Sequence, residues 1–146
     1  MGLDDHEVNL DQWRLHIDGK VKGPQKLTYA ELKALPSIKR KVLLICPGVF
    51  AIHGHWKGLS VEKLLEKAGV DKEATHVTFA GPEGDFEKVE RFTLEEILSG
   101  KVFLAYEVNG KPLPLKHGFP LRLVAEDHYG NDWVKYVYKV TVVKQT

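Results

Sequence analysis

The stretch KVLLICPGVFAIHGHWKG, residues 41–58, contains Cys46, the single cysteine of the chain. The run KVLLIC, residues 41–46, is of strand length and almost wholly apolar, and Pro47 and Gly48 follow it immediately. A run of this kind predicts a central strand that is covered on both faces. The Pro-Gly pair would bend the chain away from that strand and leave backbone amides near the sulfur.

Residue chemistry alone leaves three roles open for Cys46. A buried thiol at the end of a strand usually packs as a small apolar side chain. As a nucleophile it would need a base, which His53, His55 or His117 could supply, although no local signature of a cysteine hydrolase is present. As a zinc ligand beside His53 and His55, it would lack the ligand spacing that is typical of structural zinc sites.

The length and composition limit the class of protein. A chain of 146 residues predicts one domain, residues 1–146. The 21 basic and 20 acidic residues nearly balance, which argues against a nucleic-acid partner. No apolar run approaches the ~18 residues of a membrane span, and the polar N-terminus is not typical of a signal peptide. A lone cysteine forms no internal disulfide, so both the cytoplasm and export with the signal removed stay open as compartments.

Hydrophobic periodicity predicts short helices between strands. Two helix starts show capping-box spacing, Thr28 with Glu31 and Thr93 with Glu96, and Gly69 marks a helix end. Besides 41–46, we expect strands at 13–21, 75–81, within 102–114, 120–126 and 133–143, with helices at 27–36, 60–69 and 91–100. The alternation is too irregular for a doubly wound parallel sheet. The sequence therefore predicts an α+β class, a β-rich mixed fold with short helices between strands.

A second cluster of polar residues lies in LPLKHGFPLRLVAEDHYGNDWVKY, residues 113–136. Its ordinary interpretation is a solvated hairpin with surface charges. Taken together, however, a histidine, an arginine on one strand and a lysine on the next could form a basic pocket for a phosphate-bearing ligand, because arginine holds phosphate oxygens bidentately. No glycine-rich nucleotide loop of either common type occurs. The residues of this cluster are His117, Gly118, Arg122, Tyr129, Gly130 and Lys135.

In these two clusters and in the blocks between them, the sequence resembles the sulfite oxidase-type molybdopterin-binding domain. This group includes eukaryotic sulfite oxidases, plant nitrate reductases and the catalytic subunit of the bacterial methionine sulfoxide reductase. Trp56 follows Cys46 by ten residues, as in the bacterial reductase branch. The matching blocks, in order, are WRLHIDGKV, LTYAELKALP, the strand ending at Cys46, WKGLSVEKLLEKAG, LAYEVNGKPLPLKHGFPLRLV and YG followed by VKY.

The resemblance implies a molybdenum–molybdopterin cofactor. Cys46 matches the cysteine whose thiolate coordinates the metal, and soft sulfur suits that role. His117, Arg122 and Lys135 match positions that grip the pterin and its phosphate. The implied cofactor site comprises Cys46, Gly48, Trp56, His117, Gly118, Arg122, Tyr129, Gly130 and Lys135.

The implied activity is oxygen-atom transfer at a Cys-ligated molybdenum, with a small-molecule substrate. The chain carries no haem or flavin motif, so a separate redox partner protein would exchange the electrons. Two departures from the family pattern bear on this. No arginine follows Cys46 closely, which argues against sulfite or nitrate as substrate, and Gly84-Asp85-Phe86 replaces an Asp-Gly-Tyr segment. A cofactor-free binding or accessory module on the same fold is therefore the alternative, and a thiol or zinc hydrolase using Cys46 is a third.

Overall fold

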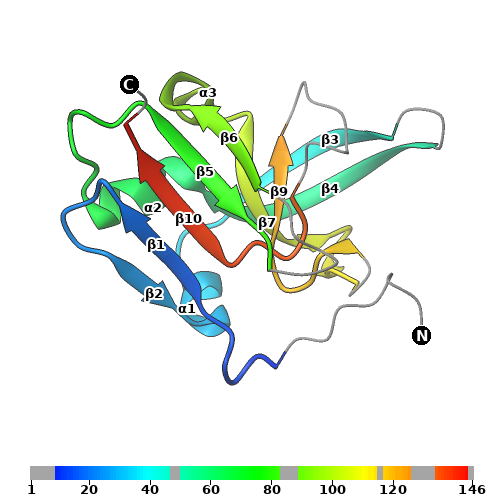
Figure 1. Ribbon diagram of the computed structural model, residues 1–146. Helices are drawn as coiled ribbons and strands as arrows, with labels where there is room; N and C mark the ends of the chain where they lie inside the picture. Colours follow the sequence, from blue (N-terminus) through cyan, green and yellow to red (C-terminus); the bar gives the residue numbers. More distant parts are fainter. Residues whose placement is uncertain (1–8, 47–49, 83–88, 115–116, 126–133, 145–146) are drawn as a thin grey trace.

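The computed structural model describes residues 9–46, 50–82, 89–114, 117–125 and 134–144, and of residues 43–46 and 50–53 it describes the backbone alone. Two five-stranded sheets form the fold (Figure 1). The first has the order β2-β1-β10-β5-β6, and consists of β1 (Leu15–Gly19), β2 (Gln25–Leu27), β5 (His76–Ala80), β6 (Val89–Thr93) and β10 (Lys139–Val143). The second has the order β3-β4-β7-β8, with β9 on β7, and consists of β3 (Ile38–Cys46), β4 (Phe50–Ser60), β7 (Val102–Val108), β8 (Lys111–Pro112) and β9 (Arg122–Ala125).

Within the described residues, three short helices connect strands: α1 (Tyr29–Ala34), α2 (Val61–Ala68) and α3 (Leu94–Leu98). Both predicted capping boxes form, since Thr28 and Thr93 each exchange hydrogen bonds with the glutamate three residues on. Gly69 ends α2 in the left-handed conformation, as predicted. The α+β class is confirmed, and β10 mixes directions by pairing parallel to β1 and antiparallel to β5.

One cluster of buried apolar side chains joins both sheets and the helices. The apolar stripe of α2 (Val61, Leu64, Leu65 and Ala68) is buried, and this helix contacts β4 and β7. Leu15 and Ile17 of the first sheet and Leu104 and Leu123 of the second belong to the same cluster. Fully burying an aliphatic side chain contributes about 1.5–3 kcal/mol, so this shared core holds the sheets together. No helix in the described ranges has the length and hydrophobicity needed to cross a membrane.

The β3–β4 hairpin corrects the prediction for the region around Cys46. Residues 50–60, for which the sequence predicted no strand, form the long strand β4. β3 pairs with β4 alone, so it is an edge strand of the described sheet and not the predicted central one. Glycine is unfavourable in strand interiors, so the glycines of this segment argued against a strand. Gly58 is nevertheless required in β4, because a Cβ at this position would overlap the carbonyl oxygen of Leu104 on β7.

Two further predictions are wrong in extent. The predicted helix 91–100 begins as strand β6, and only residues 94–98, α3, are helical. The predicted long strand 133–143 is a strand only over β10, so Lys135 lies in irregular structure before it and not on a strand. In both places the residue pattern suggested one continuous element, whereas strand pairing in the folded chain includes only part of the segment.

Candidate cofactor site around Arg122

Arg122 is the central residue of the candidate site. Strand β9 places it opposite Ala105 of β7, and its side chain is buried, with 2% of its surface exposed. Its Nη1 donates a hydrogen bond of 3.0 Å to the backbone oxygen of His117. Its Cζ lies 5.4 Å from the centroid of the Trp56 ring, a distance at which the guanidinium is attracted to the aromatic face. A carbonyl and an indole therefore hold this cation in place.

Trp56 is fixed in turn by strand β4. Its side chain is buried, and Nε1 donates to the backbone oxygen of Val42 across the hairpin at 3.3 Å. A Cβ added at Gly54 would lie 2.8 Å from the same Nε1, so the indole rests directly on that glycine. The ring can therefore shift little without losing its contact with Arg122.

Arg122 and Lys135 both pack against the backbone of Gly118. Its φ of +111° is a conformation that side-chain-bearing residues rarely adopt. A Cβ at this position would lie 3.0 Å from Cβ of Arg122 and 3.4 Å from Cβ of Lys135. The turn that carries it is closed by a 2.9 Å hydrogen bond from the His117 amide to the Pro114 oxygen. Lys135 itself is exposed, so one cation is buried and the other faces solvent.

Five of the residues expected in the cofactor site thus lie together: Trp56, His117, Gly118, Arg122 and Lys135. The alternative interpretation of the second cluster, a solvated hairpin with surface charges, is wrong for Arg122 because its side chain is buried. Arginine is rarely buried without a dedicated set of partners. Burial of this guanidinium therefore indicates a built site.

Cys46 has only its backbone described. It is the last residue of β3 and pairs with Phe50. Arg40, the partner of Trp56 on β3, precedes it by six residues, or about 20 Å of strand. Figure 1 shows the β3–β4 hairpin extending away from the first sheet. The structure thus separates the backbones of Cys46 and Trp56, and the predicted role of the sulfur stays a prediction.

The remaining expected site residues lie outside the described residues: Gly48, Tyr129 and Gly130, as well as the segment 84–86. In the described part of the chain, no group of three or more histidine, cysteine, aspartate or glutamate side chains could hold a metal ion. The zinc and thiol hydrolase hypotheses depend on the side chains of Cys46 and His53, which are not described. His55 is exposed on β4.

Tyr29 adds an aromatic wall next to the Gly118 turn. Its ring lies 5.6 Å from that of Phe119, centroid to centroid. Burial, followed by the charges of Glu107 and Tyr106, raises the pKa of the Tyr29 phenol above its usual value. Among the described residues its buried hydroxyl has no hydrogen-bond partner.

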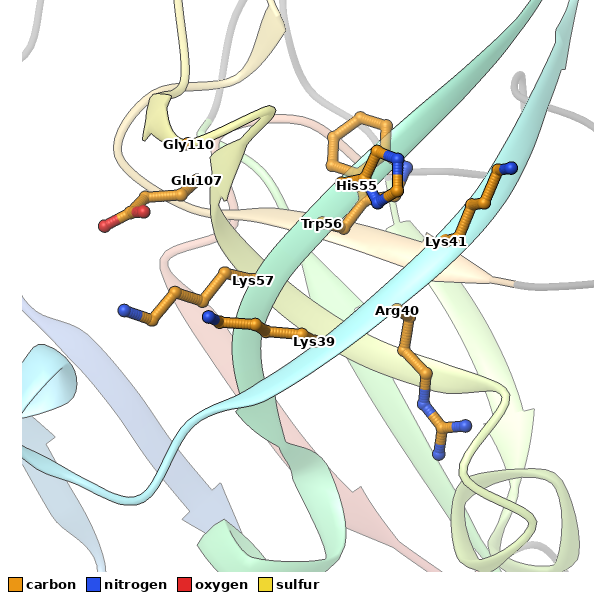
Figure 2. A pocket seen from close by; sticks show the side chains of 8 residues that line it. All are labelled: Lys39, Arg40, Lys41, His55, Trp56, Lys57, Glu107 and Gly110. Atoms are coloured by element: carbon orange, nitrogen blue, oxygen red, sulfur yellow. The ribbon is translucent and has the colours of Figure 1, made fainter.

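Sequence reasoning missed a basic hollow of about 430 Å³ on the second sheet (Figure 2). It lies over β3, β4 and β7, and most of its charged side chains are cationic. The signal was present as three basic residues at 39–41 and two more at 55 and 57, but only strand pairing shows that 39, 41, 55 and 57 share a face. Its lining residues are Lys39, Arg40, Lys41, His55, Trp56, Lys57, Glu107 and Gly110.

Comparisons with known proteins agree with the fold. The solved structure of the sulfane dehydrogenase SoxCD from Paracoccus pantotrophus matches with a TM-score of 0.88 and 25% identity, over 97% of this chain and 40% of that chain. The uncharacterized oxidoreductase YuiH of Bacillus subtilis is 31% identical over 138 residues, which cover 94% of this chain and 68% of that protein.

More distant relatives are longer proteins. An NADH nitrate reductase of Phaseolus vulgaris is 28% identical over 95% of this chain and 19% of its own length. A putative protein-methionine-sulfoxide reductase subunit of Azospira oryzae is 27% identical over 93% of this chain and 51% of its own length. The model of the oxidoreductase molybdopterin binding domain matches residues 3–146. The chain therefore belongs to the oxidoreductase molybdopterin-binding domain family, as the resemblance implied.

Proposed function

We propose that this chain is a molybdopterin-dependent oxidoreductase domain that uses the cluster around Arg122 to bind the cofactor. Family membership implies a molybdenum cofactor. The observation that carries the proposal for these residues is the buried Arg122 guanidinium, held against Trp56 and the His117 carbonyl.

The donor set fits a phosphate-bearing pterin. Arg122 offers a planar fork of N–H donors, Lys135 offers an exposed ammonium group, and both contact the Gly118 turn. Because Gly118 has no side chain, a ligand could approach its backbone closely. In this assignment Trp56 and the His117 carbonyl orient the guanidinium, Arg122 and Lys135 bind the phosphate, and His117 contacts the pterin.

Cys46 is proposed as the protein ligand of the molybdenum. A coordinated thiol is held deprotonated, and soft sulfur suits such a metal. When bound, the cofactor supplies oxygen-atom transfer coupled to two electrons, while the protein supplies position, charge and access. The substrate is a small molecule other than sulfite or nitrate, because no arginine follows Cys46 closely. A separate redox protein exchanges the two electrons.

The test is production in a host that makes the molybdenum cofactor, followed by molybdenum analysis and pterin fluorescence. Wild-type protein should carry metal and pterin at one per chain. Cys46→Ser should lose the molybdenum, and Lys26→Gln, an exposed lysine on β2, should keep both and serves as the control. A folded wild-type protein that carries neither metal nor pterin in that host overturns the proposal and favours the cofactor-free module.

A further inference from the structure

The basic hollow on the second sheet shares Trp56 with the cluster around Arg122, but its lysines have no role in the proposed function. Around its volume of about 430 Å³, the Lys and Arg side chains come from 39, 40, 41 and 57, with Glu107 as the acid among the lining residues. We propose that this hollow docks an acidic segment of a partner protein. This inference goes beyond the proposed function and does not depend on the cofactor.

Strand register concentrates like charge on one face. Lys39 lies directly opposite Lys57, and Lys41 lies opposite His55, in alternate rows of the β3–β4 ladder. Figure 2 shows the Lys39 and Lys57 side chains extending in the same direction over the hollow. Like charges that face each other across strands destabilise a sheet. An anionic partner would remove this repulsion, which gives the arrangement a physical reason.

Protection of a sheet edge explains only part of this pattern. Lysines on an edge strand prevent pairing with another chain, and β3 is an edge strand in the described sheet. Lys57 and His55, however, lie on β4, which is paired with β3 on one side and with β7 on the other. β4 has no open edge there to protect. Its basic residues therefore need another explanation.

The cations of the hollow are available to a ligand. Ion pairs in the described part of the chain engage Lys63, Lys139 and Lys144. None of the described ion pairs engages Lys39, Lys41 or Lys57. Glu107 lies opposite Lys57 on β7 and lines the same hollow, but none of the described ion pairs joins it to these three lysines.

Two hydrogen bonds between His55 and Asn109 hold one side of the hollow in place. The Asn109 amide donates to the His55 oxygen at 2.8 Å, and the His55 amide donates to Asn109 Oδ1 at 2.9 Å. A register shift between Lys57 and Gly58 adds local twist to the same strands. The concave surface is therefore preformed, because paired strands hold it without a bound partner.

The spacing favours a polypeptide with alternating carboxylates. Rows two residues apart on a strand are separated by about 7 Å, which equals the spacing of residues i and i+2 in an extended peptide. The chain as a whole has a net charge of only +1, whereas a nucleic-acid-binding domain is normally basic overall. We therefore assign the hollow to a carboxylate-rich protein segment and not to a nucleic acid.

The experiment uses a fluorescein-labelled (Glu-Ser)₅ peptide, with anisotropy measured against the whole chain at low salt. Wild-type protein should bind the peptide, and added salt should weaken binding because the contacts are ionic. Lys39→Gln/Lys57→Gln should weaken binding about tenfold, since it removes one full row of charge. The control Lys26→Gln/Lys72→Gln removes the same charge from exposed sites elsewhere and should change affinity less than about twofold.

Four outcomes overturn the inference. One is no binding of the peptide to the wild type, and another is equal loss in both double variants, which would indicate general charge attraction. A third is loss confined to Lys135→Gln, which would place binding at the cofactor site. The last is tighter binding of a dT₁₀ oligonucleotide than of the peptide. Lys41→Gln, in the second row, gives an independent variant, and unchanged melting temperatures confirm that each protein folds.

Discussion

Gly118→Ala should damage both the fold and the cofactor site, for reasons that can be separated. The residue has a φ of +111°, which glycine adopts freely and alanine does not. The new Cβ would also lie 3.0 Å from Cβ of Arg122 and 3.4 Å from Cβ of Lys135. These atoms are at the base of each side chain, so a rotamer change does not relieve the contact. Arg122 must therefore shift, whereas the 3.4 Å contact with Lys135 is an ordinary one.

The magnitude follows from these two terms. Backbone strain of this kind costs on the order of 1–3 kcal/mol, and overpacking costs roughly 1–3 kcal/mol. A combined loss of about 3 kcal/mol lowers the melting temperature by about 10 °C in a chain of this size. Gly110→Ala is the matched control, because Gly110 also has a positive φ, +83°, but a Cβ there meets no atom within 4 Å. It should cost only about 1–2 kcal/mol.

The assay combines urea and thermal unfolding with pterin content after production in a cofactor-competent host. Gly118→Ala should lose most of the pterin as well as stability, whereas Gly110→Ala should keep the pterin and lose about 4 °C. The packing argument is wrong if the two variants lose equal stability. The site assignment is wrong if Gly118→Ala is destabilised as expected but retains full pterin occupancy.

Two other substitutions test the same region. Arg122→Met should abolish pterin binding and lower the unfolding free energy in urea by about 1–3 kcal/mol, because it removes the hydrogen bond to the His117 oxygen and the contact with Trp56; a stability loss with retained pterin would show that Arg122 serves the fold. Tyr29→Phe should raise the unfolding free energy at pH 7 by up to about 1 kcal/mol, because it removes a buried hydroxyl that lacks a partner among the described residues. Burial, then Glu107 and Tyr106, raises the pKa of Tyr29, so its contribution is complete below the usual value of 10.0 and is lost as pH rises through the folded pKa. Urea titrations from pH 8 to 11 should therefore show a steeper alkaline loss for the wild type than for the variant, and parallel curves would contradict the assignment.

Local signals in the chain predicted the local structure correctly. Thr28 and Thr93 start helices because the side chain that caps each one is only three residues from its partner glutamate. Gly69 ends α2 because glycine alone adopts the left-handed conformation without penalty. Block order and spacing along the chain were also sufficient to indicate the family, which the comparisons confirmed.

Local sequence signals did not predict which strands pair. The segment 50–60 contains three residues that interrupt a strand pattern, Gly54, His55 and Gly58, yet it is the longest strand. Its conformation depends on β3 and β7 on either side, which supply its hydrogen bonds. The apolar run ending at Cys46 predicted a central strand, but no periodicity states which neighbours a strand will have.

By itself, the sequence determined what depends on neighbouring residues: helix ends, the α+β class, the near-neutral charge, and the residue types needed to bind a phosphate. Only the tertiary structure decided that Trp56, 66 positions before Arg122, would lie against its guanidinium. It also decided that basic residues of two strands would share one hollow. The physical reason is that burial and charge proximity are properties of space, and strand pairing connects positions whose separation along the chain carries no local signal.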